Sequence, residues 1–189
     1  GFVMTYSTLA SIVKYPFPSI LAGKKPKFGF FTTEIEDYIK IAEELGIKRL
    51  SQEGEPIKYA RHPLVFLVEA ADDICYQMMD IEDAYKLKLL TPRETKELYQ
   101  LFLDEKKKER VEEVFRLVTD ENEQIAYLRA TIIGLLVKEC TQVFMDNEEA
   151  ILDGTFEGAL IKHISSPLNN AYKQCSKVAV EKIYRSRDV

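Results

Sequence analysis

Residues 61–90 read RHPLVFLVEAADDICYQMMDIEDAYKLKLL, a long apolar stretch that also carries a row of carboxylates. The spacing predicts one helix, on which Asp72, Tyr76 and Asp80 fall within an arc of about 80°, because an α-helix turns by about 100° per residue. Glu69 and Asp83 project onto the same arc. Apolar residues occupy most of the remaining circumference, so we expect the helix to be buried rather than to lie at the surface.

Two interpretations of this row are open. Acidic residues on a helix commonly form its solvated face. A solvated face would also carry basic or amide side chains, yet Gln77 is the one such residue between Pro63 and Asp83. In a buried helix the carboxylates would need a metal ion, basic side chains or a water-lined cleft, because an unpaired charge in the interior is costly. The second interpretation makes the row a candidate site.

Length and composition limit the class of protein. The 189 residues are 46% hydrophobic and 30% charged with a net charge of −5, enough for one domain or one lobe of a larger protein. The acidic balance argues against nucleic acid as the main partner. Three separated cysteines indicate reduced thiols and a cytoplasmic location. Neither a membrane-spanning run nor a signal peptide is present, and the abrupt ends suggest a piece of a longer polypeptide.

The remaining segments also have helical signals. Thr33 with Glu36 predicts a capping box, Gly46 a helix-ending glycine, and Thr91 with Glu94 a second capping box. Alternating strand patterns are absent, so the expected fold class is all-α. The helices expected beside the central one are Thr5–Tyr15, Thr33–Leu45, Thr91–Leu103, a charged helix or junction over Asp104–Glu113, a helix capped by Thr119 or Asp120 and ending near Met145, one or two short helices within Asn147–Ser166, and Ser166–Tyr184.

Several kinds of catalytic site are missing. The two histidines, His62 and His163, do not form a zinc motif, and neither a phosphate-binding glycine loop nor a nucleophile elbow is present. His62 precedes the central helix, where a capping or surface role is favoured over a ligand role. Asp72 could supply one metal ligand, but hard cations need several. The basic loop with Lys24, Lys25 and Lys27 either attracts an anion or is simply solvated.

Four blocks of the sequence resemble the bacterial deoxyguanosine triphosphate triphosphohydrolases of the HD-domain superfamily. These blocks are Arg61–Tyr76 with Asp80–Ala84, Leu9 to Pro16, Lys27–Phe31, and Cys175 to Tyr184. The match is loose between about Asp104 and Ser165. The resemblance implies a partial HD-domain-like bundle that lacks the N-terminal helices with the His and His-Asp ligands. Residues 1–90 would be the rest of the catalytic core and residues 91–189 a C-terminal helical region.

The resemblance also implies a reaction, in which dGTP and water give deoxyguanosine and tripolyphosphate with Mg²⁺ or Mn²⁺ as cofactor. Asp72 matches the family's last metal ligand, but the His-Asp pair is absent, so the catalytic residues stay unknown and the chain alone should be inactive. Tyr76 and Asp80 match residues that hold the deoxyribose. Lys14 matches a phosphate contact, suited to that role as a compact charge.

Two further residues are candidates for substrate binding on the same resemblance. Asp73 stands where a related enzyme carries a phosphate-binding lysine, and Arg129 is either a phosphate contact or part of a structural salt bridge. The expected partners are a deoxynucleoside triphosphate, further copies of the chain in a homo-oligomer, and a regulatory nucleotide; a membrane is not expected.

The alternative function is a non-catalytic helical module for regulation or assembly. A module has no reason to bury Asp72, Tyr76 and Asp80 on one arc. Finding these side chains exposed would therefore favour the module over the enzyme.

Overall fold

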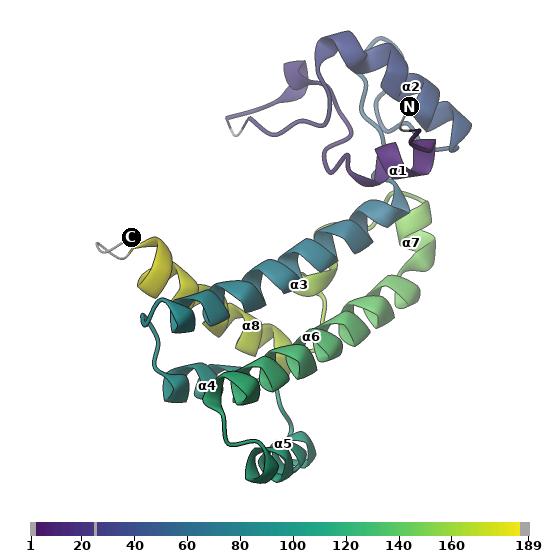
Figure 1. Cartoon of the computed structure of the whole chain (residues 1–189). Helices are drawn as coiled ribbons and strands as arrows, with labels where there is room; N and C mark the ends of the chain where they lie inside the picture. Colours follow the sequence, from purple (N-terminus) through teal and green to yellow (C-terminus); the bar gives the residue numbers. More distant parts are fainter. Residues whose placement is uncertain (1–2, 25, 186–189) are drawn as a thin grey trace. The chain divides into compact units, whose positions relative to one another are not determined.

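The computed structural model describes residues 3–24 and 26–185 (Figure 1). Within these ranges the secondary structure is helical, and strand-like pairing is confined to two isolated bridges, so the predicted all-α fold is confirmed. The helices are α1 Tyr6–Ser11, α2 Ile35–Glu44, α3 Pro63–Lys86, α4 Pro92–Gln100, α5 Glu105–Leu117, α6 Glu121–Asp146, α7 Glu148–Leu152 and α8 Ser166–Ala179, which continues as a π-helical segment over Val180–Tyr184.

Local capping signals explain where several helices begin. The Thr91 side chain accepts a hydrogen bond from the Glu94 amide at 3.2 Å, and the Glu94 carboxylate accepts one from the Thr91 amide at 2.8 Å, which confirms that capping box. Asp120 caps α6, because its Oδ1 accepts a hydrogen bond from the Glu123 amide at 3.0 Å. Thr119 is therefore not the cap.

The predicted capping box at the start of α2 is wrong in its residues. A 3₁₀ turn over Thr32–Glu34 precedes the helix, and Glu34 Oε2 accepts a hydrogen bond from the Phe31 amide at 2.8 Å. The end of α2 agrees with the prediction. Gly46 has a φ of +63° and its amide donates to the Glu43 carbonyl oxygen at 3.1 Å, as a helix-ending glycine does.

The described chain forms two compact units. The first contains the residues up to Ala70 together with Phe144–Leu160, and the second contains Ala71–Val143 together with the residues from Ile161 onward. The sequence-based division into residues 1–90 and 91–189 refers to a longer enzyme and stays a prediction. Part of the first unit's core is aromatic: the Phe30 ring stacks on Tyr38, whose ring meets the Tyr59 ring edge-on.

In the second unit, α3 contacts three other helices. It runs antiparallel to α6, as the chain colours in Figure 1 show. The buried side of α3 carries Ile74, Met78, Ile81 and Ala84, each at most 1% exposed. Three tyrosine hydroxyls tie α3 to its neighbours: Tyr99 donates to the Met78 carbonyl oxygen at 2.9 Å, Tyr172 to the Asp73 carbonyl oxygen at 2.9 Å, and Tyr85 to Asn122 Oδ1 at 2.8 Å.

Gly134, in the middle of α6, offers a test of this helix. A Cβ added at Gly134 would meet no heavy atom within 4 Å. In the unfolded chain alanine has less backbone freedom than glycine, so it loses less conformational entropy on folding. Gly134→Ala should therefore raise the free energy of unfolding by about 0.5–1 kcal/mol. Urea unfolding followed by circular dichroism measures this change.

Gly154 is the matched control for this substitution. Its φ is +70°, and an added Cβ would lie 2.5 Å from the Ala60 Cβ. Gly154→Ala should therefore destabilise the chain, because the backbone conformation and the contact both exclude a side chain. Equal effects of the two substitutions would contradict the described backbone at one of the two glycines.

Candidate functional site

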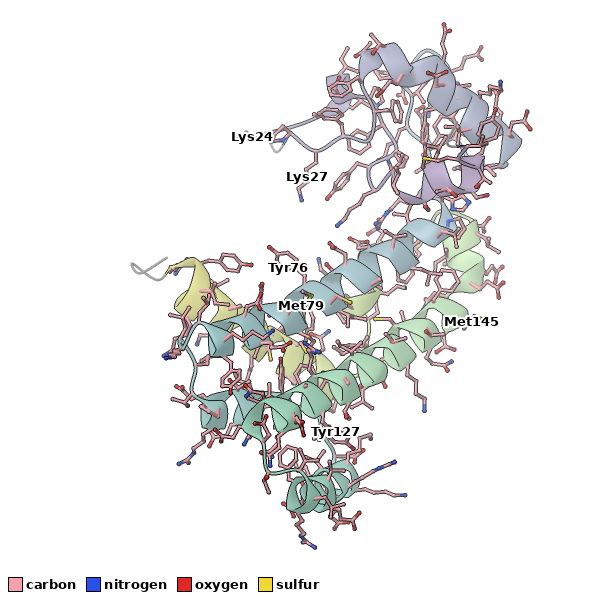
Figure 2. The ribbon with its side chains drawn as sticks, in the orientation of Figure 1. Lys24, Lys27, Tyr76, Met79, Tyr127 and Met145 are labelled. Carbon is pink, nitrogen blue, oxygen red and sulfur yellow. The ribbon has the colours of Figure 1, made fainter. Side chains whose placement is uncertain are left out.

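The row on α3 lies at the surface of the described chain. Asp72 is exposed, Tyr76 is 61% exposed and Asp80 is half-buried. Figure 2 shows the Tyr76 side chain pointing from α3 away from α6. The three side chains share one face of the helix, as the spacing predicts.

The expectation that α3 is buried all round is wrong for this chain. Several apolar residues of the helix are open to solvent: Leu64, Leu67, Val68 and Met79 are 41, 39, 47 and 53% exposed. By helical spacing Val68 and Met79 lie beside the row, whereas Leu67 projects from the opposite side. Over Ala71–Lys86 the buried apolar side chains lie opposite the row, and the side that carries the row is open to solvent. By the criterion set out from the sequence, the exposure of Asp72 and Tyr76 favours the non-catalytic module.

Tyr184 joins the row from the C-terminal π-helical segment. Its hydroxyl donates a hydrogen bond to Asp80 Oδ2 at 2.8 Å and lies 3.4 Å from the Tyr76 hydroxyl. The hydrogen bonds with Tyr76 and with the Asp80 carboxylate raise the pKa of Tyr184. Sequence reasoning gave Tyr184 no role, although it ends one of the four resemblance blocks.

Arg129 forms an ion pair with Glu82. The Glu82 carboxylate, which is 12% exposed, also accepts a contact from Lys86 Nζ at 3.1 Å. Both contacts link or stabilise helices of the second unit, α3 and α6. They agree with the structural alternative for Arg129, and its predicted role as a phosphate contact stays a prediction.

Asp73 is oriented differently from its neighbour Asp72. Asp73 is half-buried, and its carbonyl oxygen accepts the Tyr172 hydroxyl. Burial, followed by the Asp73 charge, raises the pKa of the Cys140 thiol to about 11. Asp73 therefore acts electrostatically on groups of α6 and α8, and its predicted role in substrate binding stays a prediction.

In the first unit, Lys14 lies in an ion cluster. Lys14 Nζ is 2.8 Å from Glu69 Oε1, and Arg61 Nη2 is 2.5 Å from Glu69 Oε2. Burial alone would raise the pKa of the Glu69 carboxyl, but the hydrogen bonds and charges of Lys14 and Arg61 outweigh burial and lower the pKa below its usual 4.5.

The lowered pKa of Glu69 predicts a pH dependence of stability. The unfolded chain binds the Glu69 proton more tightly than the folded chain does, so the cluster stabilises the fold above about pH 4.5 and loses this contribution as the pH falls through the lowered pKa. Urea unfolding from about pH 7 to about pH 3 should show a smaller loss of stability in Glu69→Gln than in the wild type. Identical pH dependence in both proteins would contradict the charged cluster.

His62 has the capping role favoured from the sequence. Its Nδ1 accepts a hydrogen bond from the Leu64 amide at 3.2 Å, at the start of α3. Burial lowers the pKa of His62, so the neutral ring that can accept this bond is favoured.

The basic loop has one described contact of interest. Lys27 Nζ donates to the Tyr15 hydroxyl at 3.1 Å, and Lys24 and Lys27 project from the loop in Figure 2. Lys25 lies outside the described residues. Both interpretations of the loop, anion binding and simple solvation, stay open.

The described residues do not supply a complete cation site. Over residues 3–24 and 26–185, no group of three or more His, Cys, Asp or Glu side chains is placed to hold a metal ion. The predicted role of Asp72 as a metal ligand stays a prediction. All three cysteines are free thiols. None of the described helices is both long and apolar enough to span a membrane.

Fold and site together define an all-α protein with carboxylates and apolar residues on an exposed helix face. No protein-family model matches the chain. A deoxyguanosinetriphosphate triphosphohydrolase-like protein of Pseudomonas aeruginosa (strain LESB58) is 32% identical over 194 residues, which cover 99% of this chain and 42% of that protein. A protein of the same name from Synechocystis sp. is 33% identical over 171 residues, which cover 86% of this chain and 37% of that protein.

The chain therefore belongs to the family of deoxyguanosinetriphosphate triphosphohydrolase-like proteins. It spans about two fifths of the length of these relatives.

Proposed function

We propose that the chain is part of a deoxynucleoside triphosphate triphosphohydrolase that converts dGTP and water into deoxyguanosine and tripolyphosphate. The observation that carries this proposal is that Asp72, Tyr76 and Asp80 share one face of α3. The names of the relatives support the same class of reaction. Tests of activity need the full-length protein, meaning a polypeptide that carries this chain and spans the length of its relatives.

In this proposal each residue of the row has a separate task. Asp72 would supply one carboxylate ligand to Mg²⁺ or Mn²⁺, and the remaining ligands would come from outside this chain. When bound, such an ion would polarise the phosphate and help to activate water. Water adds to the α-phosphorus, the bond from that phosphorus to the 5′-oxygen breaks, and the 5′-oxygen takes up a proton.

The sugar and phosphate contacts follow from side-chain chemistry. The Asp80 carboxylate can accept a hydrogen bond from the 3′-hydroxyl, and Tyr76 can pack on the sugar ring and exclude a 2′-hydroxyl. Lys14 provides a compact positive charge for the polyphosphate. On the basis of the family resemblance, the full-length protein would also form a homo-oligomer and bind a regulatory nucleotide.

The exposure of the row is compatible with an enzyme if another part of the full-length protein covers it, and the uncovered apolar residues beside the row support such a cover. Val68 and Met79 would cost free energy if they stayed in water, at about 25 cal/mol for each Å² of apolar surface. A face of this kind marks a surface that another part of a protein covers. In the full-length protein that cover would also enclose Asp72 and Tyr76.

Release of deoxyguanosine tests the proposal. The full-length protein with Mn²⁺ should release deoxyguanosine from dGTP and should leave GTP intact, as liquid chromatography would show. In Tyr76→Ala the preference for dGTP over GTP should fall, because the side chain that excludes the 2′-hydroxyl is lost.

A non-catalytic module is the second candidate, and the exposure of Asp72 and Tyr76 favours it. It predicts that the full-length protein hydrolyses neither dGTP nor any other deoxynucleoside triphosphate, with or without added nucleotide activators. That result would overturn the enzyme and leave the module.

A further inference from the structure

The cluster around Glu69 has an asymmetric construction. One carboxylate bridges two cations, with Oε1 on Lys14 and Oε2 on Arg61. The Glu69 side chain is 10% exposed, the Arg61 side chain 21% and the Lys14 side chain 43%. The cluster therefore has an inner cation and an outer cation, joined by a nearly buried anion.

The inner cation is fixed from several directions. Arg61 Nη1 donates to the Gly158 carbonyl oxygen at 3.3 Å, and the guanidinium carbon lies 4.4 Å from the centroid of the Phe66 ring. Phe66 in turn packs edge-on against Phe156, with ring centroids 5.4 Å apart. Arg61 can thus hold Glu69 Oε2 in one place, since a planar guanidinium that is stacked and hydrogen-bonded has little freedom.

The outer cation is in contact with Glu69. Lys14 follows the six-residue helix α1, and its side chain is 43% exposed. A lysine ammonium carries three N–H donors on a stem with about 2 kcal/mol of rotamer entropy. A carboxylate that is itself fixed restricts this freedom, and the side chain stays 43% exposed to solvent.

We propose that Glu69 is a positioning residue for phosphate binding: it transmits the rigid placement of Arg61 to Lys14 and so sets the point at which Lys14 meets a polyphosphate. This inference rests on the proposed function, in which Lys14 contacts the phosphates of the substrate. Sequence reasoning placed Glu69 on the acidic arc of the central helix without giving it this task.

An electrostatic role and a positioning role of Glu69 predict opposite effects of Glu69→Gln on the binding of an anion. Removal of a negative charge next to Lys14 would by itself strengthen the binding of an anion. Loss of the bridge would weaken it, because glutamine has one acceptor oxygen and its amide N–H groups would face a cation. The direction of the change in affinity therefore separates a positioning role from a merely electrostatic one.

The experiment is a titration of this chain with sodium tripolyphosphate, with affinity taken from the shifts of the backbone amide signals at and around position 14 in NMR. Lys14→Gln and Glu69→Gln should each weaken binding by about fivefold or more, as expected for a charge-assisted hydrogen bond. Glu181→Gln is the matched control, because Glu181 forms a similar pair with Lys177, 3.9 Å apart, in the second unit. It should leave the affinity within about twofold of wild type.

The outcomes separate the two levels of the proposal. If Lys14→Gln weakens binding but Glu69→Gln binds equally or more tightly, the positioning role is overturned and the phosphate contact of Lys14 stands. If Lys14→Gln has no effect, the phosphate contact is overturned and the positioning role falls with it. Should Glu69→Gln not fold, Glu69→Asp decides, since it keeps the charge but is one methylene shorter. Weaker binding by Glu69→Asp supports positioning, and wild-type affinity overturns it.

Discussion

Asp72→Asn should lower the dGTP hydrolysis rate of the full-length protein by on the order of a thousandfold, because a neutral amide is a much weaker ligand for Mg²⁺ or Mn²⁺ than a carboxylate. The folded structure should be unaffected, because Asp72 is exposed in the described chain. The rate is measured as deoxyguanosine released at saturating dGTP, and the melting temperature is measured on the same sample.

Asp83→Asn is the control for this substitution. Asp83 lies on the same arc of the helix and is also exposed, but it is not proposed to bind the ion or the substrate. The dGTP hydrolysis rate of the Asp83→Asn protein should stay within about threefold of wild type, because loss of one exposed surface charge has only a small energetic effect. If the wild-type protein hydrolysed dGTP and the Asp72→Asn protein did so at the same rate, Asp72 would not be a metal ligand.

Tyr99→Ala should destabilise the chain by about 3–5 kcal/mol, the range for truncation of a large aromatic side chain in a core. Tyr99 is completely buried, and its hydroxyl donates to the Met78 carbonyl oxygen at 2.9 Å, so it joins α4 to α3 through both packing and a hydrogen bond. Burial raises the pKa of Tyr99, which keeps the hydroxyl protonated and able to donate.

Tyr99→Phe separates the two contributions. It keeps the ring and removes the hydroxyl, so it should cost about 1 kcal/mol. Urea unfolding of the two variants and the wild type measures both values. A loss in Tyr99→Ala no larger than that in Tyr99→Phe would contradict the packing of α4 against α3.

Features that depend on neighbouring residues could be predicted from the sequence. The helical spacing of Asp72, Tyr76 and Asp80, the Thr91–Glu94 capping box and the helix-ending Gly46 all follow from contacts within a few residues, and the structure agrees with each. The start of α2 could not be placed correctly, because Glu34 competes with Glu36 for the capping role and only the backbone turn at Phe31 decides between them.

Features that depend on tertiary packing could not be predicted. Tyr184 reaches Asp80 from 104 positions away, and Arg129 reaches Glu82 from 47. The exposure of α3 is a similar case. Its apolar composition indicates that both sides of the helix tend to be covered, but composition cannot say which side this chain covers by itself.

Phosphorus NMR of dGTP incubated with the full-length protein and Mn²⁺ would decide whether this chain belongs to a working triphosphohydrolase. Attack at the α-phosphorus predicts that tripolyphosphate signals appear as those of dGTP disappear, without dGDP as an intermediate. Stepwise release of inorganic phosphate through dGDP, or an unchanged dGTP spectrum, would contradict the proposed reaction.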